Sequence, residues 1–283
     1  MSFYDELKKI DRYDYLSKYG TFDVSQIKES NCEVIKCDNV LEYMFEQKMP
    51  QDGGFGINEL VNVKLPFEEV FIEAKIEGDD MGIWSIFQED RNRIFSVCYY
   101  RFKGSQPFSP MIFDVTHDNN GKPIKWGSEW NQTYKSNIIQ NFGHKEFEYN
   151  DSLYLAYFYV SLLTVQFMHC KNVRKIENDP NTEIPRRVRS HWEKKGKPPL
   201  TKYYTLEIEP LKKILKTEGD IEKNGLKLAL HICRGHFKDF SDGKGLFGKY
   251  KGLYWWDSQV RGHKEYGEVV KDYNVNTLEK GDI

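Results

Sequence analysis

Histidine and arginine gather twice near the C-terminal end of the sequence. The first group holds His231, Arg234 and His236 within six residues, and the second holds Arg261 and His263 around a glycine. Imidazole exchanges protons near neutral pH, and guanidinium binds phosphate oxygens in a fork. One imidazole can take a proton from a ribose hydroxyl while another protonates the leaving oxygen, and arginine stabilises the charge of the transition state. The catalytic candidates for such metal-independent phosphodiester cleavage are His231, His236 and His263, and the phosphate-binding candidates are Arg234 and Arg261.

The same residues have two other interpretations. Histidines beside aromatic strands often bond a backbone carbonyl, and an Arg-Gly step can end a strand with an internal ion pair. Cys233 and its neighbouring histidines, with His169 and Cys170 from a distant segment, also offer zinc ligands. The sequence contains neither Cys-x-x-Cys nor His-x-x-x-His, the spacings typical of zinc sites. We therefore expect no metal and no cofactor.

Four carboxylates near predicted strand ends are the other candidate metal ligands. They are Glu73, Glu89, Asp90 and Asp114. Carboxylate oxygens suit Mg²⁺, but nothing in this spacing distinguishes a magnesium site from a solvated face.

Two predicted strands carry the histidine and arginine groups. They cover Leu226 to Cys233 and Lys249 to Trp256, and a further strand is expected over Glu268 to Tyr273. If two strand ends share one rim, the two groups converge there. Tyr254 and Trp255 lie on the second strand, and their flat faces could stack on bases.

A separate basic segment lies between Pro185 and Pro199. It carries six Lys or Arg and one Glu, and its phosphate-binding candidates are Arg186, Arg187 and Arg189. We expect a short helix or an exposed loop. The wider stretch 185–264 holds nineteen Lys or Arg against nine Asp or Glu, although the whole chain has a net charge of −2. This asymmetry indicates a basic surface for an anionic partner, or one that pairs with the acidic remainder of the chain.

The first two thirds of the chain must provide the scaffold. From Val61 to Trp126 apolar residues alternate, and the connections are too short for crossover helices, which predicts an antiparallel meander. The expected strands cover residues 69–76, 82–87, 94–100 and 111–115. A helix from about Ser152 to Met168 is apolar on most faces, so we expect it to be buried against the sheet.

These elements predict an α+β protein with an antiparallel β-rich N-terminal portion, a buried central helix and a basic β-rich C-terminal portion. We divide the chain into a helical or irregular segment 1–60, a sheet with the central helix over 61–175, and a basic α+β portion over 176–283. No linker separates them, so they should pack as one unit.

Composition places the chain among globular proteins of a reducing compartment. Of the 283 residues, 39% are hydrophobic and 15% aromatic, which favours a packed core over disorder. Five scattered cysteines form no disulfide framework, and the first residues lack the pattern of a secretory signal. No apolar run approaches the roughly twenty residues of a membrane span. We expect a cytoplasmic protein without a membrane partner.

The cluster also carries a resemblance. Residues 230–240, together with Gly245 to Gly248, Tyr254 to Trp256 and Val260 to Gly262, resemble uncharacterised proteins encoded by phages and other mobile elements. The shared pattern is H-x-C-R-G-H-F followed by W-W and a later R-G. No established activity comes with it. The resemblance implies a phage-related cytoplasmic setting, where nucleic-acid chemistry and interference with host defence are common.

Two functions from different classes follow. The leading hypothesis is a phage-related protein that acts on nucleic acid, with RNase-like hydrolase chemistry at the histidine and arginine cluster. The alternative is a protein without enzymatic activity that binds nucleic acid or a host or phage protein. The sequence decides neither enzymatic activity nor oligomeric state.

Overall fold

The structure is a computed structural model. It describes residues 2–9, 27, 30–46, 57, 60–88, 92–103, 105, 107–208, 229–233, 235–256, 259–261 and 263–268, with the backbone alone at 43–46, 133, 229–233, 259–261 and 263–268. The chain forms two compact units. The larger comprises Met1–Leu41, Ile57–His169 and Arg174–Glu207, and the smaller comprises the remaining segments.

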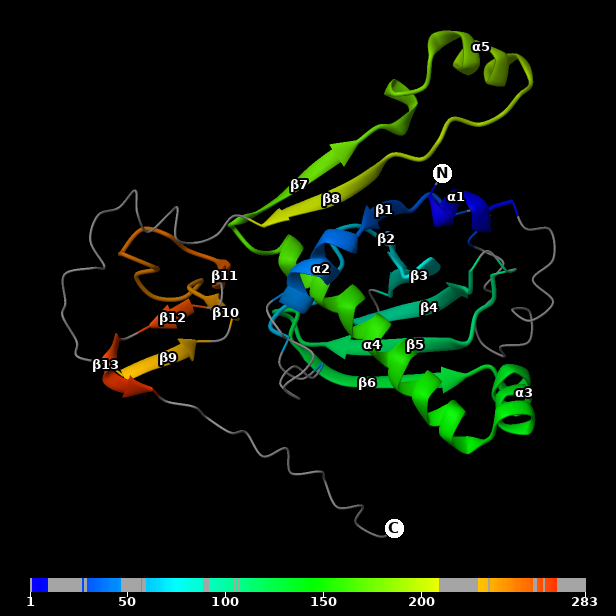
Figure 1. Cartoon of the computed structure of the whole chain (residues 1–283). Coiled ribbons are helices and arrows are strands. Elements are labelled where there is room, and N and C mark those ends of the chain that lie inside the picture. The colour runs from blue at the N-terminus through cyan, green and yellow to red at the C-terminus, as the bar shows by residue number, and fades with distance from the viewer. Residues whose placement is uncertain are drawn as a thin grey trace. The chain divides into compact units, whose positions relative to one another are not determined.

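The larger unit is built on an eight-stranded sheet in the order β6-β5-β4-β3-β2-β1-β8-β7 (Figure 1). The strands are β1 (Glu33–Lys36), β2 (Glu69–Ile76), β3 (Asp79–Gln88), β4 (Arg93–Arg101), β5 (Met111–His117), β6 (Pro123–Trp130), β7 (Val173–Asn178) and β8 (Tyr203–Ile208). Strands β2 to β5 form the predicted antiparallel meander, which β6 extends by a strand that was not predicted, whereas β1 lies parallel to both β2 and β8.

Helices α1 (Phe3–Leu7) and α4 (His144–Met168) pack on opposite faces of this sheet. The other helices are α2 (Asp38–Glu46), α3 (Gln132–Phe142), α5 (Arg186–Lys194) and the 3-10 turn η4 (Pro180–Thr182). On one face Phe158 of α4 stacks on Phe113 of β5, with ring centroids 4.2 Å apart. The neighbouring Ile112 belongs to the opposite face, where it shares a buried cluster with Tyr4 of α1. Burial on both faces explains why the central strands are almost continuously apolar.

One close approach in the sheet depends on a glycine. The ring of Phe71 lies across Gly82 on the neighbouring strand, and a Cβ at that position would come within 2.2 Å of its Cζ atom. A side chain at Gly82 would therefore displace a fully buried aromatic ring.

The smaller unit contains two short sheets. Its strands are β9 (Ala229–Cys233), β10 (His236–Asp239), β11 (Leu253–Trp256), β12 (Gln259–Arg261) and β13 (His263–Glu268). Strands β10 and β11 pair with each other, and β9 lies between β12 and β13. Asn172 fixes β11 in place, because its side chain accepts from the Trp255 N–H at 3.0 Å and donates to the Trp255 carbonyl at 2.9 Å.

The α+β class is confirmed. The larger sheet takes β1 from the segment expected to be helical or irregular, and it takes β8 from the basic C-terminal portion. Helix α4 begins at His144, eight residues before the predicted start. No helix of the described residues is long and apolar enough to cross a membrane.

Candidate nucleic-acid interface

Strands β7 and β8 form a hairpin at one edge of the larger sheet, and it extends into α5 (Figure 1). We call residues 173–208 the arm. Arg174 to Glu177 are all exposed, and β7 joins the sheet through its pairing with β8, with Lys175 also lying over the Phe67 ring. The segment 186–194 was expected to be a short helix or an exposed loop, and it is a nine-residue helix.

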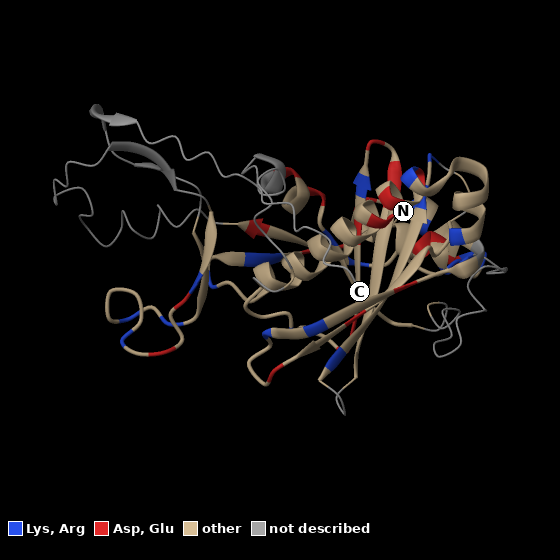
Figure 2. Ribbon diagram, turned by 90° about the horizontal axis from the view of Figure 1, so that it is seen from below, with Lys and Arg blue, Asp and Glu red and all other residues tan. Residues whose placement is uncertain are grey.

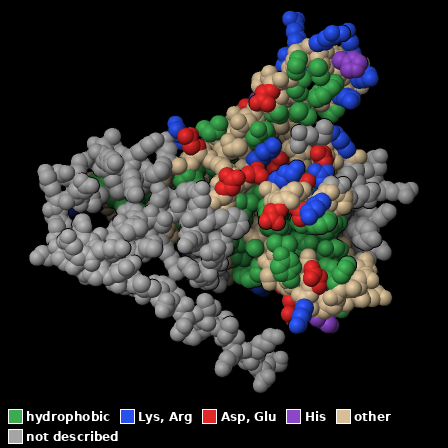
Figure 3. Space-filling model, in the orientation of Figure 1, with side chains coloured by type: hydrophobic (Ala, Val, Ile, Leu, Met, Phe, Trp, Pro, Cys, Tyr) green, Lys and Arg blue, Asp and Glu red, His purple; other side chains and the backbone are tan. Residues whose placement is uncertain are grey.

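Basic side chains surround the end of the arm (Figure 3). All of them are exposed: Arg186, Arg187, Arg189, His191, Lys194, Lys195 and Lys197. The apolar residues Val188 and Trp192 are four positions apart and share one side of the helix, which leaves the other side to the cations. The phosphate-binding candidates Arg186, Arg187 and Arg189 thus lie together on one element.

These cations form no ion pair with the carboxylates that the structure describes. None of the six Lys or Arg side chains from Arg186 to Lys197 lies within ion-pairing distance of a described carboxylate. Arg189 donates to the Asn181 carbonyl at 3.5 Å, and Lys197 lies over the Trp192 ring. Arg186 and Arg187 occupy the first turn of α5, where the helix dipole disfavours positive charge. Their positions do not stabilise the helix, whereas an anionic ligand would be attracted to both.

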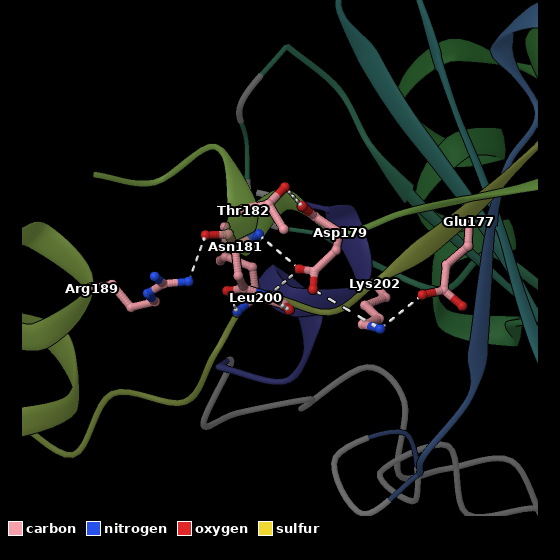
Figure 4. A network of polar contacts seen from close by, with 7 residues as sticks. All are labelled: Glu177, Asp179, Asn181, Thr182, Arg189, Leu200 and Lys202. Atoms are coloured by element: carbon pink, nitrogen blue, oxygen red, sulfur yellow. Dashed lines mark hydrogen bonds and ion pairs between the residues drawn. The ribbon is translucent and has the colours of Figure 1, made fainter. Parts of the chain in front are cut away.

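A polar network fixes the two sides of the arm to each other (Figure 4). The Asn181 side chain accepts from the Leu200 N–H at 2.9 Å and donates to the Leu200 carbonyl at 2.8 Å. It also donates to Asp179 at 2.8 Å. Asn181 therefore joins two positions nineteen residues apart in the sequence, with hydrogen bonds in both directions.

Charge strengthens the network at its base. Lys202 donates to Glu177 at 2.8 Å and lies 4.0 Å from Asp179. The hydrogen bond from Asn181 lowers the pKa of Asp179, and the bond to Glu177 raises the pKa of Lys202. Both groups thus keep their charge over a wide pH range, and the arm should hold its shape throughout it.

The sheet and α1 anchor the base of the arm. Val34 and Ile35 of β1 pair with Tyr203 and Tyr204 of β8. The Thr201 hydroxyl donates to Asp5 of α1 at 2.5 Å. These contacts connect the arm to the core of the larger unit, so α5 is presented from a fixed base.

The histidine and arginine cluster lies in the smaller unit, where the structure gives the backbone of three of its members. Arg261 of β12 is the direct partner of His231 in β9, and His263 of β13 pairs with Ala229 on the other side of β9. Arg234 lies outside the described residues. The backbone register thus groups His231, Arg261 and His263 on three adjacent strands.

His236 lies on β10, in the two-stranded sheet of the smaller unit. It pairs with Trp256, in the same register as the β9–β12 ladder. Its ring is half-buried and stacks on Trp256 with centroids 6.4 Å apart, and Lys238 covers the same indole at 4.3 Å. His236 and His231 thus belong to different sheets, and the His236 ring already stacks on an indole.

The two residues expected to stack on bases are buried. Tyr254 is 4% exposed, and Trp255 is fully buried against Phe237, with ring centroids 4.6 Å apart. A buried ring offers no free face to a base. The corrected role of both residues is to form the core of the β10–β11 hairpin.

The alternative metal sites find little support in the described side chains. No three His, Cys, Asp or Glu among them lie close enough to hold a metal ion. The His169 ring bonds the Lys64 carbonyl at 2.7 Å, and Asp114 lies 3.3 Å from Arg93. Glu89, Asp90 and the side chain of Cys233 lie outside the part of the chain that the structure describes.

Glu73, one of the four carboxylates considered as metal ligands, is buried, which the sequence analysis did not predict. It is 5% exposed and accepts from the Tyr4 N–H at 3.0 Å, with Lys36 3.9 Å away. Burial raises its pKa to about 7. Its position in the middle of an apolar run, between Ile72 and Ala74, was the available signal.

No family model, curated protein or solved structure matches the chain. Functional inference therefore rests on the arm and the cluster themselves.

Proposed function

We propose that the protein binds nucleic acid through the basic arm. The observation that carries the proposal is the set of six exposed Lys and Arg side chains from Arg186 to Lys197, none of which pairs with a described carboxylate. Cations gathered on an element with a fixed base suit a row of phosphates, because no internal ion pair has to break on binding.

The contacts are to the phosphate backbone. No aromatic ring on α5 is fully exposed, since Trp192 is half-buried. Phosphate contacts by α5 should therefore outweigh base stacking, and its affinity should depend little on base sequence. The resemblance to phage-encoded proteins supports phage or host nucleic acid as the ligand.

Salt dependence tests the proposal. For duplex DNA the logarithm of the binding constant falls with the logarithm of salt concentration by about 0.9 for each phosphate neutralised. In a variant with Arg187→Gln, Lys194→Gln and Lys195→Gln, the magnitude of this slope should be smaller by about two to three. A matched control with Lys75→Gln, Lys122→Gln and Lys145→Gln removes three exposed charges elsewhere. Equal slopes for both variants would contradict the role of the arm.

A second candidate, metal-independent RNA cleavage, is favoured by one observation. The register pairs Arg261 with His231 and brings His263 to the opposite side of β9. We propose His231 and His263 as the proton-transfer pair and Arg261 as the phosphate ligand, with His236 outside the reacting group.

The test is incubation of labelled RNA in EDTA with the wild-type chain and with the variants His231→Ala, His263→Ala and His236→Ala. Loss of cleavage in the first two and retention in the third is the expected pattern. Intact RNA with the wild-type chain would remove the cleavage hypothesis and leave binding by the arm untouched.

A further inference from the structure

Strand β6 is the last strand at the edge opposite the arm (Figure 1). Within the described part of the chain it pairs only with β5, so one row of its backbone N–H and C=O groups has no strand beside it. Its side chains are mostly exposed, including Ile124 at 66% and Trp126 at 37%. An exposed edge of eight residues is a template for another strand.

The charged side chains of the two edge strands, β7 and β6, differ in their ion pairing. On β7, Arg174 bonds Glu207 at 3.0 Å, and Glu177 accepts from Lys202 at 2.8 Å. On β6, Lys125 and Glu129 are exposed, and neither has an ion-pair partner among the described residues. Arg174 and Glu177 of β7 thus form ion pairs within the arm, whereas Lys125 and Glu129 of β6 form none with the described residues (Figure 2 shows the charged positions along the ribbon).

The spacing of these two charges is self-complementary. Lys125 lies two residues before Gly127, and Glu129 lies two residues after it. In an antiparallel pair of two β6 strands related by a twofold axis at Gly127, Lys125 of each copy lies opposite Glu129 of the other. We propose that β6 binds β6 of a second copy of this chain, and that the two sheets join into one.

Apolar side chains support the same register. Ile124 and Trp126 lie on one face of β6 because side chains alternate along a strand. The twofold pairing sets Ile124 against Trp130 of the second copy and brings the two Trp126 rings to diagonal positions, about 7–8 Å apart between backbones. The same arrangement thus covers two of the large apolar side chains that the single chain leaves exposed.

A charge swap tests the dimer by sedimentation equilibrium of the full chain. Wild type should dimerise, and Lys125→Glu or Glu129→Lys alone should raise the dimer dissociation constant about tenfold or more, because two attractive pairs become repulsive. The double variant with both changes should restore dimerisation. A wild-type chain that is monomeric at its highest soluble concentration would overturn the proposal, and so would a double variant as weak as the single ones.

A cysteine pair tests the register separately. Lys125→Cys with Glu129→Cys places two thiols about 13 Å apart on one strand, too far for an internal disulfide but opposite each other across the dimer. The native Cys32, Cys37, Cys98 and Cys170 are buried and should not react, and Cys233 is replaced by serine in every variant of this test. Mild oxidation should yield a covalent dimer. The same cysteines at Lys122 and Lys145 should not, and equal crosslinking at both pairs would contradict the register.

Discussion

Replacement of Glu73 by glutamine should stabilise the protein at neutral and alkaline pH. The carboxylate is 5% exposed and its best partner is the Tyr4 N–H. The Glu73→Gln side chain keeps an oxygen acceptor for that N–H and removes the buried charge. The substitution therefore isolates the cost of burying a carboxylate beneath α1.

The magnitude follows from the pKa of Glu73, which burial raises from 4.5 to about 7. Below pH 4.5 both folded and unfolded chains carry the proton, and Glu73 costs nothing. Between pH 4.5 and 7 the unfolded chain loses the proton first, so stability falls as the pH rises. Above pH 7 the cost is constant at about 3 kcal/mol, since each tenfold change in acidity is worth about 1.4 kcal/mol.

Urea denaturation at pH 5 and pH 8 measures the effect. The variant should gain little at pH 5 and about 3 kcal/mol at pH 8. Glu42→Gln is a control because Glu42 is exposed, and it should show no such difference. Loss of stability for Glu73→Gln at pH 8 would refute the reasoning, because it would mean that the charge at this site stabilises the fold.

Two further predictions concern the arm. Asn181→Ala removes the hydrogen bonds to both backbone groups of Leu200, so Leu200 should exchange its amide hydrogen faster by about tenfold or more. Because no charge is lost, the affinity for DNA should fall while the salt slope stays constant. In the β6 dimer two eight-stranded sheets join edge to edge, with one arm at each outer edge. At about 4.8 Å between neighbouring strands, the two arms lie about 70 Å apart. This distance is the length of about 20 base pairs, so the affinity for duplex DNA should rise sharply once the duplex exceeds that length.

Both predictions have clear contradicting outcomes. Unchanged exchange at Leu200 would show that Asn181 does not close the arm, and a reduced salt slope would mean that it contributes to phosphate binding. A smooth rise of affinity with duplex length would contradict bivalent binding. Lys125→Glu should abolish the sharp rise and leave the affinity for short duplexes unchanged.

Local pattern was sufficient for the meander. The apolar run over 69–76, bounded by charged residues, predicted β2 with its observed bounds, and its near-continuous apolar character agrees with burial of both faces of the strand. Strand β1 was missed, since four residues carry too little periodicity and its pairing with β2 and β8 is non-local. The start of α4 was missed because its first turns, from His144 to Asn150, are mostly polar and exposed apart from Phe147, whereas the prediction rested on apolar residues.

The candidate site was predictable in composition but not in geometry. Charge alone identified Arg186 to Lys197 as a basic segment. The contact of Asn181 with Leu200 spans nineteen residues and leaves no periodic signal, so the closed arm could not be predicted. Tyr254 and Trp255 were assigned the wrong role for another reason. Aromatic residues on a short strand can either stack on bases or pack in a core, and the sequence does not distinguish the two. The burial of both residues in the structure does.

The most direct test of the central claim is the salt dependence of duplex DNA binding, measured by fluorescence anisotropy on the wild-type chain and on the Arg187→Gln, Lys194→Gln, Lys195→Gln variant. If α5 contacts phosphates, the variant should bind more weakly, with a slope smaller by about two to three. The same affinity and slope in both proteins would show that the arm does not bind nucleic acid.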